Sequence, residues 1–100
     1  MFNVNGLDWQ IIIVSANHPK LKNKLGMCEA DTQTIYLSDS IPNYKFKKVL
    51  CHEITHAAMF SYRVYMTIDQ EELVADLIAT YGEEIIEVTN RIFNKIRGKY

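Results

Sequence analysis

Two histidines and a glutamate in the middle of the chain have the spacing of a metal site. The segment 51–57 reads CHEITHA and contains His52, Glu53 and His56. Residues four apart on a helix are rotated by only about 40° from one another, so both imidazoles project from one face and can bind one metal ion. Glu53 follows the first histidine directly, where it could take a proton from a metal-bound water without binding the metal itself.

A catalytic zinc site usually has three protein ligands, so a further donor is needed. Glu72 and Asp76 lie four residues apart and share a helix face, so one can bind the metal while the other orients a histidine through its free N–H. Alternatively, Glu72 serves only the helix N-terminus and Asp76 is a solvated surface residue. Glu71 competes with Glu72 as the ligand, but it has no carboxylate three or four positions further on. His18 is the only other histidine, and its lysine-flanked loop would have to fold over the site.

Two helices must position these groups. The first is predicted from about Tyr44 to Tyr62, with Pro42 in its first turn or Asn43 as its cap. Its apolar residues recur at helical spacing, and the main ones are Phe46, Val49, Leu50, Ala57 and Phe60.

The second helix is predicted from near Asp69 to about Arg97. A capping box is expected at its start, formed either by Thr67 with Gln70 or by Asp69 with Glu72. Gly82 falls in the middle and could kink or split the helix. A long apolar stripe follows the helix, formed by Val74, Ile78, Tyr81, Ile85, Val88, Ile92 and Ile96.

Three short strands are predicted before the first helix. The segment 9–15 (WQIIIVS) is rich in β-branched residues and is expected to be buried on both faces. The segments 25–29 and 34–38 form two further strands, joined by a turn at 30–33. The sequence therefore predicts a single α+β domain over residues 1–100, with a small antiparallel or mixed three-stranded sheet, an active-site helix and a long or broken C-terminal helix.

The composition is that of a globular domain. Hydrophobic residues make up 48% of the chain, charged residues 23%, and the formal net charge is -1. This balance provides no strong signal for nucleic-acid binding, and the lysines at 20–24 and 45–48 are expected to be solvated surface. No signal peptide or membrane-spanning stretch is visible, and two cysteines form no secreted disulfide framework. We therefore expect a cytoplasmic protein that does not enter a membrane.

Together, the two motifs resemble those of the gluzincin metallopeptidases. Residues 52–56 (HEITH) followed by residues 72–79 (ELVADLIA) are most similar to the ImmA/IrrE type, whose second signature is Glu-x-x-Ala-Asn-x-x-Ala. Asp76 stands where that family often has Asn and where thermolysin-like enzymes have Asp. The resemblance implies a minimal zincin-like fold, Glu72 as third zinc ligand, Glu53 as catalytic base and Asp76 as partner of a ligand histidine. It also suggests an origin in a phage or mobile element.

One element of the thermolysin pattern has no counterpart here. No histidine follows Glu72, so the downstream histidine that assists the transition state is missing. The candidates for stabilising an oxyanion are Tyr62, Arg63, Tyr65 and His18, and nothing in the sequence chooses among them.

The favoured hypothesis is a zinc-dependent peptidase that hydrolyses a peptide bond in a protein or peptide substrate, with Glu53 activating the zinc-bound water. Such a substrate could pair with a sheet edge, for which the segment 34–38 is the predicted strand. The alternative is a zinc-containing module that binds or regulates another protein with little turnover. A metal-free interaction domain that uses the lysine stretches ranks last.

Overall fold

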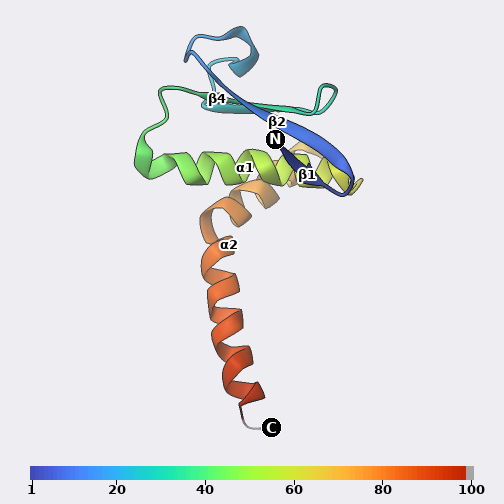
Figure 1. The fold of residues 1–100 in the computed structure, drawn as a ribbon, viewed down its shortest axis with the longest axis vertical. Helices are drawn as coiled ribbons and strands as arrows, with labels where there is room; N and C mark the ends of the chain where they lie inside the picture. The colour runs from blue at the N-terminus through green and yellow to red at the C-terminus, as the bar shows by residue number, and fades with distance from the viewer. Residues whose placement is uncertain (99–100) are drawn as a thin grey trace.

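The computed structural model describes residues 1–98 and shows a sheet with both helices on the same side of it (Figure 1). The sheet has four strands in the order β1-β2-β4-β3. Their bounds are β1 Phe2–Val4, β2 Leu7–Val14, β3 Gly26–Glu29 and β4 Thr34–Ser38. β2 pairs parallel with β4, whereas the β1–β2 and β3–β4 pairs are antiparallel. The expected α+β class is therefore confirmed, and the sheet is mixed.

The predicted number of strands was wrong, because β1 was overlooked. The turn between β1 and β2 consists of Asn5 and Gly6, whose φ angles are 48° and 81°. Asn-Gly with two positive φ angles is the preferred sequence of a two-residue hairpin turn. The dipeptide was therefore a local signal from which this extra strand could have been predicted.

The expectation that the strand at 9–15 is buried on both faces was also wrong. Trp9 is fully buried, but Ile11, Ile12 and Ile13 are 36%, 37% and 54% exposed. β1 pairs only with Leu7–Trp9 of β2, so the rest of β2 has a neighbour on one side alone. Side chains alternate along a strand, so Ile11 and Ile13 lie on the same face as their buried β4 partners Ile35 and Leu37, and their exposure follows from this edge position. Ile12 lies on the opposite face, and both helices lie on one side of the sheet (Figure 1).

The core lies between the sheet and α1, which spans Asn43–Ser61. Its fully or nearly fully buried members are Trp9, Ile35, Leu37, Ile41 and Ala57. The Trp9 indole N–H donates a hydrogen bond of 2.9 Å to the Ser61 hydroxyl, and both residues are buried. This bond satisfies the indole and attaches the end of α1 to the sheet, close to the site described below.

α1 begins and ends within a residue of its predicted bounds. Pro42 precedes the helix as its N-cap residue without a side-chain hydrogen bond, so neither of the expected starts is seen. At the other end, Arg63 adopts a left-handed conformation with φ 56°. The backbone N–H of Val64 donates a hydrogen bond to the Met59 carbonyl, and the backbone N–H of Arg63 donates one to the Phe60 carbonyl. This pattern is a Schellman motif, which stops α1 and turns the chain toward the second helix.

α2 spans Ile68–Arg97 without interruption, so Gly82 does not split it. Thr67 and Gln70 form the capping box, which confirms the first of the two expected caps. The first turns of α2 pack beside α1, and the remainder projects away from the sheet, which makes the molecule 55 Å long (Figure 1). None of the helices in residues 1–98 combines the length and apolar character that crossing a membrane requires.

Candidate metal centre

α1 presents its two histidines on the side that faces α2. The Nε2 atoms of His52 and His56 lie 3.2 Å apart, and the two rings are tilted by 60° with their centroids 4.9 Å apart. The four-residue spacing produces this arrangement directly, because it returns the helix to nearly the same direction one turn later. Both side chains are partly buried, which limits the competing contacts of their rings with water.

α2 supplies a carboxylate to the same point. The Glu72 carboxylate lies 3.2 Å from His52 Nε2 through one oxygen and 2.8 Å from His56 Nε2 through the other. One nitrogen or oxygen from each of these three residues falls within 4.8 Å of the others. The structure thus brings His52, His56 and Glu72 together, although the glutamate lies 16 positions after the second histidine.

The outer nitrogens of the two rings are each held by a different carboxylate. Asp76 Oδ1 lies 3.0 Å from His52 Nδ1, and Glu71 Oε1 lies 2.6 Å from His56 Nδ1. Sequence reasoning considered Glu71 only as a rival metal ligand and did not assign it this contact. Its position directly before Glu72 was the available signal, but the crossing of the two helices decides which histidine it reaches.

The donor set fits a cation. A carboxylate beside each Nδ1 favours the tautomer with a proton there, which leaves the Nε2 lone pairs of His52 and His56 directed at each other and at the Glu72 carboxylate. Three electron-rich groups at this separation repel one another unless a positive charge lies between them. Two imidazoles and one carboxylate are also a ligand set of catalytic zinc sites.

Glu53 lies beside these donors and is largely buried. Its side chain is 7% exposed and packs against β3 at Gly26, where an added Cβ would come within 3.0 Å of the glutamate Cγ and Oε2 atoms. Burial is the main factor that raises the pKa of Glu53, and the nearby Glu72 raises it further, while His52 and His56 lower it. A carboxyl with a raised pKa takes up a proton more readily, as a general base requires.

A cleft of about 1140 Å³ opens next to the donors. It is lined by His52, Glu53, His56 and Glu72, by β3, and by the connection between the helices, including Arg63 and Tyr65. Two of the four oxyanion candidates therefore line the cleft.

His18 is engaged elsewhere. Its Nδ1 accepts a hydrogen bond from the backbone N–H of Lys20 at the start of a short 3-10 helix, Pro19–Leu21, and its ring stacks on Tyr36. It belongs neither to the group of converging donors nor to the lining of the cleft. The alternative in which His18 completes the site is not what the structure shows.

The predicted peptide-binding edge was wrong. β4 lies between β2 and β3, so its backbone groups on both sides are already paired. The edge strand on this side of the sheet is β3, which contributes Gly26, Met27 and Cys28 to the cleft. The sequence of this short strand does not reveal that it has a parallel neighbour on one side and an antiparallel neighbour on the other.

Comparison with known proteins adds no relative: no protein-family model, curated protein or solved structure matches this chain.

Proposed function

We propose that this protein is a zinc-dependent peptidase with a minimal zincin-like fold. The observation that carries the proposal is the convergence of His52 Nε2, His56 Nε2 and the Glu72 carboxylate, with a separate carboxylate on the far nitrogen of each ring. A structural ion pair would not need both rings to be oriented in this way. The proposed activity is the one that the resemblance to the gluzincins implies.

Each residue has a defined task in this proposal. His52, His56 and Glu72 hold the metal, while Asp76 and Glu71 fix the direction of the rings. Zinc held by these residues would act as a Lewis acid that makes water more acidic and polarises a peptide carbonyl. Glu53 accepts the proton of the attacking water and passes it to the leaving amine.

The position of Glu53 supports this task. Its burial raises the pKa of its carboxyl, and the packing against Gly26 restricts where the carboxylate can move. A fixed base loses little freedom on reaching the reactive geometry. The substrate would lie in the cleft as an extended chain, and β3 is the sheet edge available there for backbone pairing.

The first experiment is elemental analysis of the protein purified without added metal. We expect about one zinc per chain in the wild type and a large loss in Glu72→Ala. Glu87→Ala is the matched control, because it removes an exposed glutamate of the same helix away from the site. A protein that stays free of metal even after zinc is supplied would contradict the proposal. Metal retained in Glu72→Ala would assign the third ligand elsewhere, first to Glu71.

Glu53→Gln separates an enzyme from a protein-binding module with the same metal. The probe is denatured casein, with new peptide ends detected by mass spectrometry. In an enzyme, the variant keeps its zinc and loses cleavage by a factor of about 100 or more, because the base is removed and the ligands stay. Wild-type protein that contains zinc but cleaves no peptide bond would favour the binding or regulatory module.

A further inference from the structure

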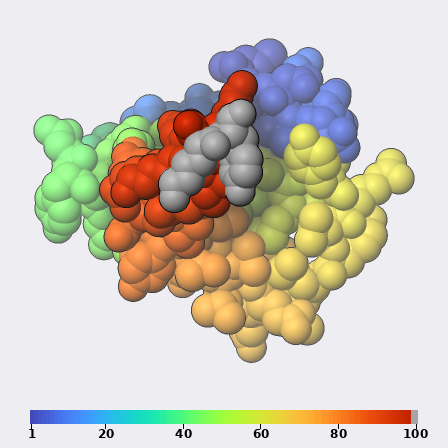
Figure 2. Space-filling view, turned by 90° about the horizontal axis from the view of Figure 1, so that it is seen from below, coloured from blue at the N-terminus to red at the C-terminus, as the bar shows by residue number. Residues whose placement is uncertain are grey.

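The second half of α2 has an apolar face that the described part of the chain leaves uncovered. Ala75 is the only buried residue of this 30-residue helix. Beyond Gly82, its large apolar side chains are 39–59% exposed, and they are Ile85, Ile86, Val88, Ile92, Phe93 and Ile96. Figure 2 views the molecule from below, with the last turns of α2 nearest the viewer and the rest of the protein behind them.

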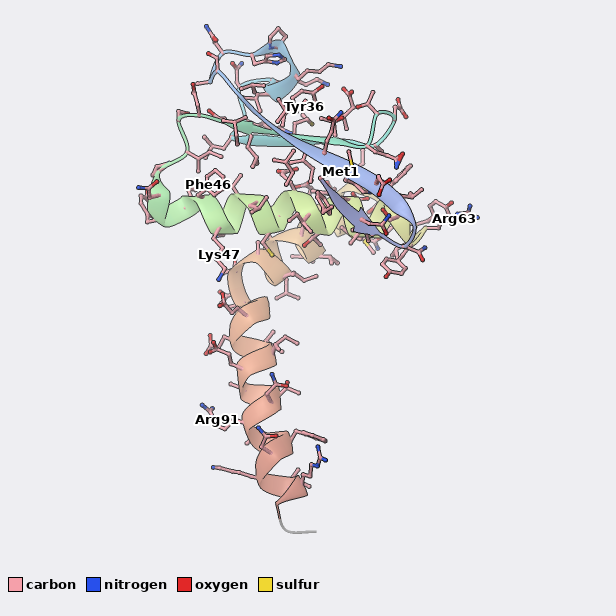
Figure 3. All side chains as sticks on the ribbon, in the orientation of Figure 1. Met1, Tyr36, Phe46, Lys47, Arg63 and Arg91 are labelled. Carbon is pink, nitrogen blue, oxygen red and sulfur yellow. The ribbon has the colours of Figure 1, made fainter. Side chains whose placement is uncertain are left out.

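α1 cannot cover this face, because it ends too early along α2. The salt bridge between Lys47 and Glu83, at 3.1 Å, joins the first turns of α1 to the middle of α2. Figure 3 shows Lys47 near this crossing and Arg91 far down the projecting part of α2. A helix that is apolar on one side normally buries that side, so the stripe indicates an interface.

The spacing of the stripe is that of a helix-helix seam. Ile78, Tyr81, Ile85, Val88 and Ile92 alternate steps of three and four residues, which are the a and d positions of a heptad repeat. Such positions pack into the side chains of one facing helix. The partner that fits this face is therefore another helix with an apolar stripe.

The charges of α2 select a second copy of the same helix. Every acidic residue of α2 precedes Arg91, and its basic residues Arg91, Lys95 and Arg97 all follow Glu87. Two copies in parallel would place like charges side by side, whereas two antiparallel copies place each acidic stretch beside a basic one. We propose that the protein forms a homodimer in which the α2 helices of two copies pack antiparallel through this stripe.

The heptad positions define the register of this dimer. In antiparallel packing, a positions face d positions, so Ile85 faces Val88 of the partner subunit and Tyr81 faces Ile92 of the partner subunit. Glu84 and Arg91 then occupy the flanking g positions, which meet each other across an antiparallel seam. Each Glu84 lies beside Arg91 of the partner subunit, and the twofold symmetry repeats this pair.

The parallel register offers nothing equivalent. It would place Lys95, a d position, against Lys95 of the partner subunit, and it would pair Glu84 with an uncharged threonine, Thr89 of the partner subunit. The antiparallel arrangement is therefore favoured both by the contacts between a and d positions and by the charge pairs at the g positions.

The dimer leaves both candidate metal centres open. Its twofold axis passes close to residues 86 and 87, about 22 Å along the helix from Glu72. The two sites then lie at opposite ends of the paired helices, so the dimer does not depend on the proposed function. Metal binding and self-association can be measured separately.

The test is sedimentation equilibrium of the full chain at low salt, between about 1 µM and about 200 µM, with and without EDTA. We expect a reversible monomer–dimer equilibrium that EDTA does not abolish. Ile85→Asp should eliminate the dimer, because it buries a charge in the seam. Its matched control is Asn90→Asp, which adds the same charge at an exposed position on the opposite side of the same helix and should leave the dimer in place.

Charge reversal tests the register. Glu84→Arg alone and Arg91→Glu alone should each weaken the dimer by about tenfold, because both symmetric pairs become repulsive. A mixture of the two single variants should associate as strongly as the wild type, because opposite charges meet again at every pair. The double variant Glu84→Arg/Arg91→Glu should recover as well. Circular dichroism verifies that each variant keeps its helices.

Three outcomes would overturn the proposal. The first is a wild-type protein that is monomeric across the whole concentration range. The second is a dimer that survives Ile85→Asp, which would place the interface elsewhere. The third is a mixture of single variants that associates no better than either alone, which would exclude this antiparallel register.

Discussion

At the scale of single residues, two carboxylates of α2 serve different histidines of α1. Asp76 lies 3.0 Å from His52 Nδ1 and Glu71 lies 2.6 Å from His56 Nδ1, while Glu72 between them reaches both Nε2 atoms. Partners of this kind hold a ligand ring in one orientation and increase its basicity. The neighbouring glutamates 71 and 72 therefore have different tasks in the proposed site.

This division of tasks predicts the effect of removing each carboxylate. Glu71→Ala and Asp76→Ala should each weaken zinc binding by about 10- to 100-fold without abolishing it, whereas Glu72→Ala should have the larger effect. Competition with a chromophoric chelator measures the affinities, and Glu87→Ala is the control. If Glu71→Ala binds zinc as tightly as the wild type, the contact with His56 has no role in metal binding.

Gly26 is a second residue whose identity the site explains. A methyl group there would lie within 3.0 Å of Glu53 Cγ and Oε2, which is closer than unbonded atoms normally approach. Gly26→Ala should therefore displace the Glu53 carboxylate, lower the cleavage rate and leave the zinc content near that of the wild type. Loss of zinc together with activity would indicate a general disturbance of the fold instead. Unchanged cleavage would show that Glu53 tolerates the shift.

At the scale of elements, the two parallel strands differ sharply in burial. β4 lies in the interior of the sheet, with Ile35 and Leu37 fully buried, whereas Ile13 of the adjacent β2 is 54% exposed. Both strands are rich in apolar residues, so composition does not reveal the difference. Ile13 pairs with Leu37 and shares its face of the sheet, so the difference arises because β1 stops pairing at Trp9 and leaves this part of β2 at an edge.

This difference in burial predicts that replacing isoleucine by alanine lowers the free energy of unfolding more in β4 than in β2. Ile35→Ala should reduce the free energy of unfolding by about 2–5 kcal/mol, because it leaves a cavity in the core. Ile13→Ala should cost less than about 1 kcal/mol, because the side chain is already half in water. Urea denaturation of both variants measures the costs. Similar losses for the two would mean that another surface covers β2.

At the scale of the whole molecule, the candidate metal centre joins the two helices. Its ligands come from the middle of α1 and the first turns of α2, and α2 extends from there without support from the sheet (Figure 1). A metal ion bound across this junction would stabilise the folded chain, because the ligands are far apart when the chain is unfolded.

Removal of the metal should therefore lower the melting temperature. With zinc at 100 times its Kd, binding contributes about 2.7 kcal/mol, so EDTA should lower the Tm by roughly 10 °C or more in a chain of this size. The variant Glu72→Ala should melt at nearly the same temperature with and without EDTA. An EDTA effect of equal size in both would mean that the chelator acts through another site.

The local elements could largely be predicted from the sequence. Backbone periodicity depends on neighbouring residues, so the bounds of both helices, the strand at 34–38 and the turn that follows β3 agree with expectation to within a residue or two. The shared face of His52 and His56 follows from the helix repeat alone. The strand β1 also has a local signal, because Asn5-Gly6 is a preferred sequence for the hairpin turn that joins it to β2.

How these elements meet depends on contacts between segments that are distant along the chain. The crossing of α1 and α2 determines that Glu71 reaches His56 and Asp76 reaches His52, because the angle depends on the packing of side chains from both helices. The strand order makes β3 the edge beside the cleft and leaves half of β2 exposed. These contacts join segments distant along the chain, and no pattern within one segment contains the geometry that brings them together.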